Sequence, residues 1–163
     1  MHNTPNDDLY REVYARFGLA YYLSECLYRE LCEILAISLL PSSSLTTRQR
    51  AEELFAYAYS LTMGEVVAKL KAVIPIEIWS ELNQAVDNRN LLAHHFWYSR
   101  AHELFDADSI MMVIADLISY ADSFDRIDNL VSNWFEPTRN QLGVSDESIR
   151  HCMQRLLEGQ LVD

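Results

Sequence analysis

Glycine and proline are scarce in this sequence, with 4 of each among 163 residues. These residues form most chain reversals, so their scarcity predicts long elements with few connections. Half of the residues are hydrophobic, which argues against a disordered chain and is enough to build a core. We therefore expect one folded domain over residues 1–163.

Cysteine is also rare. Cys26, Cys32 and Cys152 are the only three, and they form no CxxC pair. If Cys26 and Cys32 share a helix, six residues of rise separate them by about 9 Å, which is too far for a disulfide. The sequence therefore predicts reduced cysteines in a cytoplasmic protein.

Long apolar runs and common cofactor motifs are missing. The apolar stretch 110–118 is interrupted by Asp116, and residues 1–8 are polar and acidic, so we expect neither a membrane span nor a signal peptide. There is no glycine-rich nucleotide loop and no HExxH zinc motif. The aspartates between residues 116 and 128 are interpreted as a solvated helix face. No cofactor and no metal ion is predicted.

Basic residues are outnumbered, with 13 Lys and Arg against 24 Asp and Glu and a net charge of −11. A protein of this charge repels nucleic acid at long range and attracts basic partners. DNA binding is therefore not expected. The segment 82–103 is locally neutral, because Asp87 and Glu103 balance Arg89 and Arg100.

Hydrophobic residues near the N-terminus recur at spacings of three and four, which is the period of one helix face. They are Leu9, Val13, Phe17, Ala20, Leu23, Leu27, Leu31 and Leu35. The pattern predicts a first helix over residues 7–39, with Asp7 or Asp8 as its cap. Pro41 and the serines after it end this helix. Gly18 inside it marks either a weak point or a place of close helix contact.

Threonines mark the next two helices. Thr46 or Thr47 caps a second helix over residues 48–60. The sequence Thr62-Met63-Gly64-Glu65 is a capping box, which predicts a short third helix that ends before Pro75.

Two long helices should follow. Pro75 suits the first turn of a fourth helix over residues 76–100. Asp106 or Asp108 begins a fifth, over residues 109–134.

The C-terminal part contains the clearest breaks. Pro137 and Gly143 predict a loop, after which a last short helix covers residues 146–158 and stops at Gly159. Residues 144–163 are thus a candidate appendage. The whole pattern predicts an all-α fold, an antiparallel helical bundle with about five main helices plus a short C-terminal helix.

The segment Arg89-Asn90-Leu91-Leu92-Ala93-His94-His95-Phe96-Trp97 concentrates polar chemistry within the fourth helix. Arginine is a permanent cation that grips phosphate, and histidine changes charge near neutral pH. Together they can act on phosphodiesters without a metal ion. The spacing of Arg and His alone is weak evidence, and the added amide, aromatic pair and helical setting make it more specific.

The segment from Arg89 to His94 resembles the signature of the HEPN superfamily, in which an Arg and a polar residue precede a His by four to six positions. The resemblance implies a small all-α bundle, a homodimer and, in many members, a metal-independent endoribonuclease of toxin–antitoxin or defence systems. It rests on six to nine residues, and the helix plan extends it loosely from Leu9 to Trp134. Other members of the superfamily are not catalytic.

Helical geometry separates the two key side chains. On an ideal α-helix Asn90 and His94 share a face, whereas Arg89 and His94 lie about 140° apart. A two-fold dimer would supply two copies of each side chain to one site. We therefore expect His94 as base or acid, Arg89 as the phosphate grip and Asn90 as an orienting residue.

Each of these residues also has a purely structural interpretation. Arg89 can pair with an acid of a neighbouring helix, and His94 can be a satisfied core histidine. His95 either supports the site or is solvated, and Arg100 either holds a second phosphate or pairs with Glu103.

The aromatic residues either stack on bases or belong to the core or a dimer interface. They are Tyr21, Tyr22, Tyr28, Tyr57, Tyr59, Phe96, Trp97 and Tyr98.

The acidity supports a rival function. A non-catalytic immunity or antitoxin-like protein would bind a basic partner or toxin through its negative charge. A third possibility is a bundle that senses nucleotides through Arg89 and Arg100.

Overall fold

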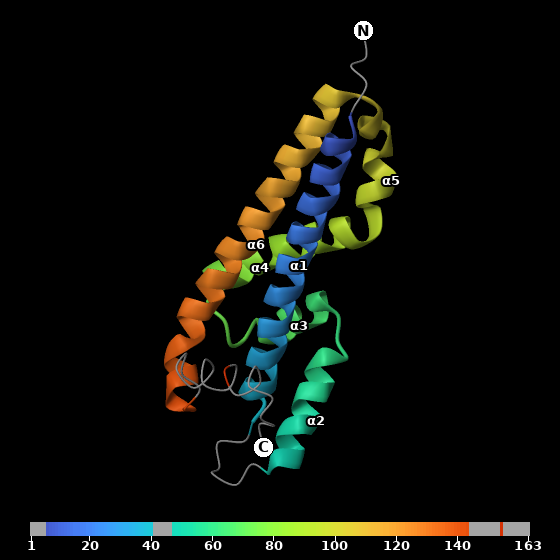
Figure 1. The fold of residues 1–163 in the computed structure, drawn as a ribbon. Helices are drawn as coiled ribbons and strands as arrows, with labels where there is room; N and C mark the ends of the chain where they lie inside the picture. The colour runs from blue at the N-terminus through green and yellow to red at the C-terminus, as the bar shows by residue number, and fades with distance from the viewer. Residues whose placement is uncertain (1–5, 41–46, 144–153, 155–163) are drawn as a thin grey trace. The chain divides into compact units, whose positions relative to one another are not determined.

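A computed structural model describes residues 6–40, 47–143 and 154, and every regular element among them is helical (Figure 1). The prediction of an all-α helical bundle is confirmed. The predicted last helix, over residues 146–158, lies outside the described residues apart from Gln154, which is helical.

The first helix, α1 (Asp7–Ser38), begins at Asp7, one of the two residues predicted as its cap. The side chain of Asn6 accepts a hydrogen bond from the amide of Leu9 at 3.0 Å, so Asn6 is the cap rather than Asp7 or Asp8. Asp7 and Asp8 instead occupy the first turn, where negative charge is favourable beside the free amides.

Helix α2 (Arg48–Tyr59) is capped by Thr47, whose side chain accepts from the amide of Arg50. Helix α3 (Met63–Leu70) carries the predicted capping box. The Thr62 side chain accepts from the Glu65 amide, and the Glu65 carboxylate accepts from the Thr62 amide at 2.7 Å. Both helix starts were therefore predictable from local sequence, α2 from Thr47 and α3 from Thr62 together with Glu65.

The predicted fourth helix, over residues 76–100, is not continuous. Helix α4 (Ile76–Asn90) passes into η1 (Leu91–His95), a π-helical turn, and then into α5 (Phe96–Arg100). A 3-10 turn, η2 (Ala101–Phe105), follows. Pro75 lies just before α4 rather than in its first turn, with an extended ψ of 144°.

Helix α6 (Ala107–Gln141) is longer than the predicted 109–134. Asp106 caps it, accepting from the Ser109 amide at 3.0 Å. The loop predicted at Pro137 is wrong, because this proline lies inside α6. A proline interior to a helix removes one backbone bond, and here the helix continues through that loss. Gly143 has a positive φ of 75° just beyond the helix, in the left-handed region that glycine adopts readily at helix ends.

Contacts divide the chain into two compact units, residues 1–130 and residues 131–163, with the boundary inside α6. A single domain remains the prediction from sequence. In the first unit α1 lies against α2, α3, α4 and η1. Large fully buried side chains there come from α1, α3, α4, η1 and α6, and they include Leu27, Leu31, Leu70, Leu82, Leu92, Ile110, Leu117, Phe124 and Ile127.

Polar bonds tie α1 to its neighbours at two levels. The Tyr28 hydroxyl donates to the carbonyl of Leu61 at 2.7 Å, and the Tyr10 hydroxyl donates to the carbonyl of Leu104 at 2.8 Å. Burial, followed by neighbouring Cys32, raises the pKa of Tyr28 to about 12. This α1 face therefore both packs the core and fastens the connections around it.

Substituting Leu27→Ala should lower the free energy of unfolding by about 2–5 kcal/mol, because a fully buried leucine leaves a cavity. Denaturant unfolding followed by circular dichroism measures the loss. Leu130→Ala, at a side chain that is 38% exposed, is the control and should cost less than about 1 kcal/mol. Equal losses in the two variants would contradict the placement of Leu27 in the core.

Tyr28 should make stability depend on pH in alkaline solution. Its folded pKa of about 12 lies above the unfolded value of 10.0, so its contribution is complete below pH 10 and is lost as pH rises toward 12. The free energy of unfolding, measured across this pH window, should therefore fall less steeply with pH for Tyr28→Phe than for the wild type. Tyr98→Phe, at a side chain that is 93% exposed, controls for loss of a hydroxyl. An unchanged slope for Tyr28→Phe would rule this linkage out.

Candidate functional site

The Arg–His segment coincides with the π-helical turn. The amide of Phe96 donates to the carbonyl of Leu91, a bond across five residues rather than four. His95 closes the turn with φ −126° and ψ −22°, outside the helical region. Such turns are rare and occur frequently at functional sites.

Aromatic packing holds the residues that follow this turn against α1. The chain changes direction between α4 and α5 (Figure 1). Phe96 is 1% exposed, and its ring centroid lies 5.2 Å from that of Phe17. The ring centroid of Trp97 lies 4.7 Å from that of Phe17 and 5.4 Å from that of Tyr14. Phe96 and Trp97 are thus packing residues, whereas Tyr98 points into solvent with 93% of its surface exposed.

Arg89 is half-buried and faces α1. Its Nη2 donates to the Glu25 carboxylate at 3.3 Å, and 24% of the Arg89 side chain is exposed. Its Nε is buried and has no hydrogen-bond partner among the described residues. A buried donor on a cation is costly when unpaired, so the Arg89 guanidinium is held by a long bond and is incompletely satisfied.

Sequence reasoning allowed for an acidic partner of Arg89 but did not find Glu25. The two residues are 64 positions apart, and no local spacing links them. Only the packing of α4 across α1 brings them together.

Asn90, His94 and His95 are exposed. The His94 and His95 ring centroids are 6.3 Å apart, with the planes at 71°. No side-chain hydrogen bond engages Asn90 or His94 within the described part of the chain. His94 is therefore not a core histidine, and both of its ring nitrogens are open to a ligand.

The π turn changes the relation between Arg89 and His94. The bond across five residues joins Leu91 to Phe96, and this wider turn covers part of the stretch from Arg89 to His94 with a smaller rotation per residue. The turn therefore reduces the 140° separation of a uniform α-helix. Within one chain Arg89 stays half-buried against Glu25, while His94 is exposed.

Arg100 is committed to two carboxylates. Its Nε and Nη2 donate to Glu103 at 2.8 and 2.7 Å, and its Nη1 donates to Asp116 of α6. The Glu103 hydrogen bond is the main cause that raises the pKa of Arg100, and Arg100 in turn lowers the pKa of Glu103. A phosphate at Arg100 would have to displace these partners, so Arg100 is first of all a brace between α5 and α6.

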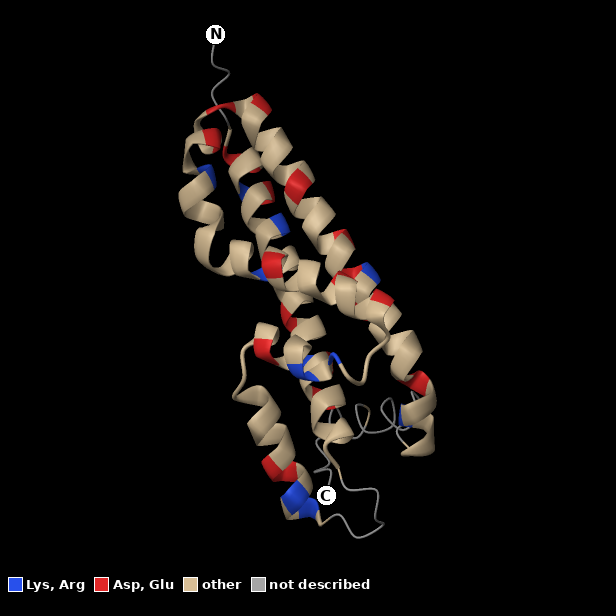
Figure 2. Cartoon of the chain, turned by 180° about the vertical axis from the view of Figure 1, so that it is seen from behind, with Lys and Arg blue, Asp and Glu red and all other residues tan. Residues whose placement is uncertain are grey.

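Basic residues elsewhere are scattered among more numerous acidic ones. Figure 2 shows basic positions on the helices beside acidic ones rather than gathered into a patch. Arg126 of α6, for example, pairs with Glu81 of α4 at 2.7 Å. Among the described residues no group of three or more His, Cys, Asp or Glu is placed to hold a metal ion, and none of their helices is long and apolar enough to cross a bilayer.

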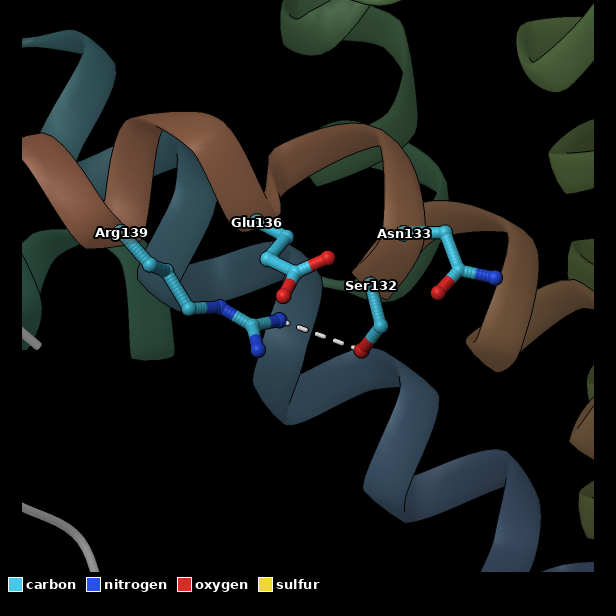
Figure 3. A pocket seen from close by; sticks show the side chains of 4 residues that line it. All are labelled: Ser132, Asn133, Glu136 and Arg139. Carbon is cyan, nitrogen blue, oxygen red and sulfur yellow. Dashed lines mark hydrogen bonds between the residues drawn. The ribbon is translucent and has the colours of Figure 1, made fainter. Parts of the chain in front are cut away.

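A polar hollow that the sequence did not indicate lies in the second unit. Ser132, Asn133, Glu136 and Arg139 line it, all from α6 (Figure 3). Arg139 reaches back along the helix and donates from Nη2 to the Ser132 hydroxyl at 3.1 Å.

Removing the carboxylate beside Arg89 should lower the stability of the fold. We expect Glu25→Gln to lower the free energy of unfolding by about 1 kcal/mol, because it leaves a half-buried cation with a weaker partner. Glu12→Gln, in the more exposed Arg16–Glu12 pair, is the matched control, with an expected loss of about 0.3–0.5 kcal/mol. Thermal or denaturant unfolding measures both, and a larger loss for Glu12→Gln would contradict the inference.

The function of the Arg89–Trp97 segment has to be argued from its own residues, because comparison with known proteins gives no match. No protein-family model, no curated protein and no solved structure matches this chain. The resemblance at Arg89 to His94 therefore rests on the motif and its helical setting.

Proposed function

We propose that this protein is an HEPN-like, metal-independent endoribonuclease of a toxin–antitoxin or defence type, acting as a homodimer with a composite site. The observation that carries the proposal is the exposure of His94 on a π turn, one turn from the half-buried, incompletely bonded Arg89. A structural histidine would be buried or bonded, and neither holds within the described residues.

The chemistry needs one base, one acid and one cation. His94 of one copy, in its neutral form, takes the proton of the ribose 2′-OH as that oxygen attacks the adjacent phosphorus. The bond from phosphorus to the 5′-oxygen breaks, and His94 of the second copy, as imidazolium, protonates the leaving oxygen. The products are a 2′,3′-cyclic phosphate and a 5′-hydroxyl.

Arg89 supplies the charge stabilisation. Its guanidinium presents five N–H donors, of which Glu25 engages one at a long distance. A phosphate oxygen is an acceptor of equal charge and better fit for the paired donors, so substrate would compete with Glu25 for this cation. Asn90 orients the phosphate or His94, and His95 and Arg100 are secondary contacts for the RNA strand.

The dimer supplies what one chain lacks. Acid and base must lie on opposite sides of the reacting phosphate, whereas His94 and His95 of one chain are adjacent in sequence with ring centroids 6.3 Å apart. Two copies of His94 across a two-fold axis meet this requirement with no further residue.

His94→Ala should reduce cleavage of a labelled single-stranded RNA by about 10²–10⁴-fold, since it removes both the acid and the base of the dimer. His102→Ala is the matched control, because His102 is also exposed but lies outside the motif. Circular dichroism and thermal unfolding verify that both variants fold. Cleavage that persists in His94→Ala, or that disappears equally in His102→Ala, would refute the catalytic assignment.

A second candidate function follows from the charges. Arg89, Arg100 and Arg126 each face a carboxylate, and the net charge is −11, as suits an immunity or antitoxin-like protein that covers a basic toxin. The assay above discriminates the two. Intact RNA with wild-type protein, together with equal stoichiometric inhibition of a basic ribonuclease by wild type and His94→Ala, would favour this function.

A further inference from the structure

The outer face of α1 carries an unusual stripe. Six exposed residues and the half-buried Glu25 follow one another at spacings of four, three, four, four, three and four, which keeps them within about 40° of one line along the helix. They are Asp7, Arg11, Tyr14, Gly18, Tyr22, Glu25 and Arg29. Tyr14 and Tyr22, on either side of Gly18, are 59% and 63% exposed.

Gly18 lies at the centre of this stripe. Glycine is the least favourable residue inside a helix apart from proline. A Cβ added at Gly18 would meet nothing within 4 Å, so packing within the chain does not require glycine there. A backbone that approaches closely from outside would require it.

The pattern of charges on the stripe fits α1 of a second copy as the approaching backbone. If a second α1 crosses antiparallel with its two-fold axis at Gly18, each residue before Gly18 faces the residue equally far after it in the other copy. Arg11 then faces Glu25, and Asp7 faces Arg29, so both pairs have opposite charge. Tyr14 faces Tyr22, pairing two exposed aromatic rings.

We propose that this stripe is the homodimer interface, with α1 packed antiparallel against α1 of a second copy about Gly18. The interface specifies the dimer on which the proposed ribonuclease function rests. Because it is isologous, each ion pair occurs twice. Arg29 forms no ion pair within the described part of one chain, and the exposed Arg11 has only a 3.6 Å contact to Asp8, so both are available.

The register also determines the level at which the candidate site lies relative to the two-fold axis. Arg89 touches Glu25, and Trp97 touches Phe17 and Tyr14, so the segment between them passes α1 at the level of Gly18. The turn η1 itself lies against α1. A two-fold axis at Gly18 therefore passes at the level of His94, and the two copies of η1 lie at the same height on either side.

Disulfide trapping tests the crossing point. In a chain whose native cysteines are replaced by serine, Gly18→Cys should give a covalent dimer under mild oxidation, because residues on the axis meet within disulfide reach and the covalent bond captures the dimer even though the added side chain weakens it. Ala115→Cys, exposed on α6, is the control and should remain uncross-linked. Trapping at residue 115 but not at residue 18, or a wild-type monomer in analytical ultracentrifugation, would overturn the interface.

Charge reversal tests the register. Asp7→Lys and Arg29→Glu should each raise the dimer dissociation constant by about three- to tenfold, since each puts like charges opposite one another twice. The double variant Asp7→Lys/Arg29→Glu restores opposite charges and should return to the wild-type value. Additive weakening in the double variant would reject the antiparallel pairing.

Gly18→Ala separates dimer from fold. It should raise the thermal midpoint of the dilute, monomeric protein while weakening the dimer, because alanine favours the helix but obstructs the crossing. An unchanged dimer dissociation constant in Gly18→Ala would count against close contact at Gly18. A monomer that cleaves RNA through His94 overturns this interface but not the catalytic role of His94. A dimer trapped at residue 18 that leaves RNA intact supports the interface and overturns the ribonuclease.

Discussion

The packing of Phe96 and Trp97 on Phe17 is the contact on which the candidate site depends. It fastens the start of α5 to α1, while the Arg89–Glu25 pair fastens the end of α4 to the same helix about two turns further along. The segment between these two anchors has a fixed span on α1. A π turn accommodates one more residue over this span than an α-helix, and His94 is thereby carried outward to solvent.

Much of the fold was predictable from local signals. Thr47, Thr62 with Glu65, and Asp106 each satisfy free amides within three residues, so the positions of these helix starts are written in the neighbouring sequence. The same reasoning missed Asn6 because the acidic residues after it are also good caps. It failed at Pro137, where the helix tolerates a lost backbone bond.

The candidate site was less predictable, for physical reasons. The π turn lies between two tertiary contacts to α1 that leave no local pattern, and the apolar run between Arg89 and His94 has the composition of an ordinary helix. Glu25 reaches Arg89 across 64 residues, and Asp116 reaches Arg100 across 16, so neither partner leaves a local pattern. The pairing of Arg100 with Glu103, three residues away, was foreseeable because one helical turn brings such residues together.

Pro137 has a consequence for the polar hollow on α6. Having no N–H, it cannot bond the carbonyl of Asn133 four residues earlier, so that oxygen must find its donor elsewhere. Asn133 is one of the four residues that line the hollow. The proline therefore removes one rung of the helix ladder beside the hollow, and the last turn of α6 is held there by one backbone hydrogen bond fewer than a helix without proline.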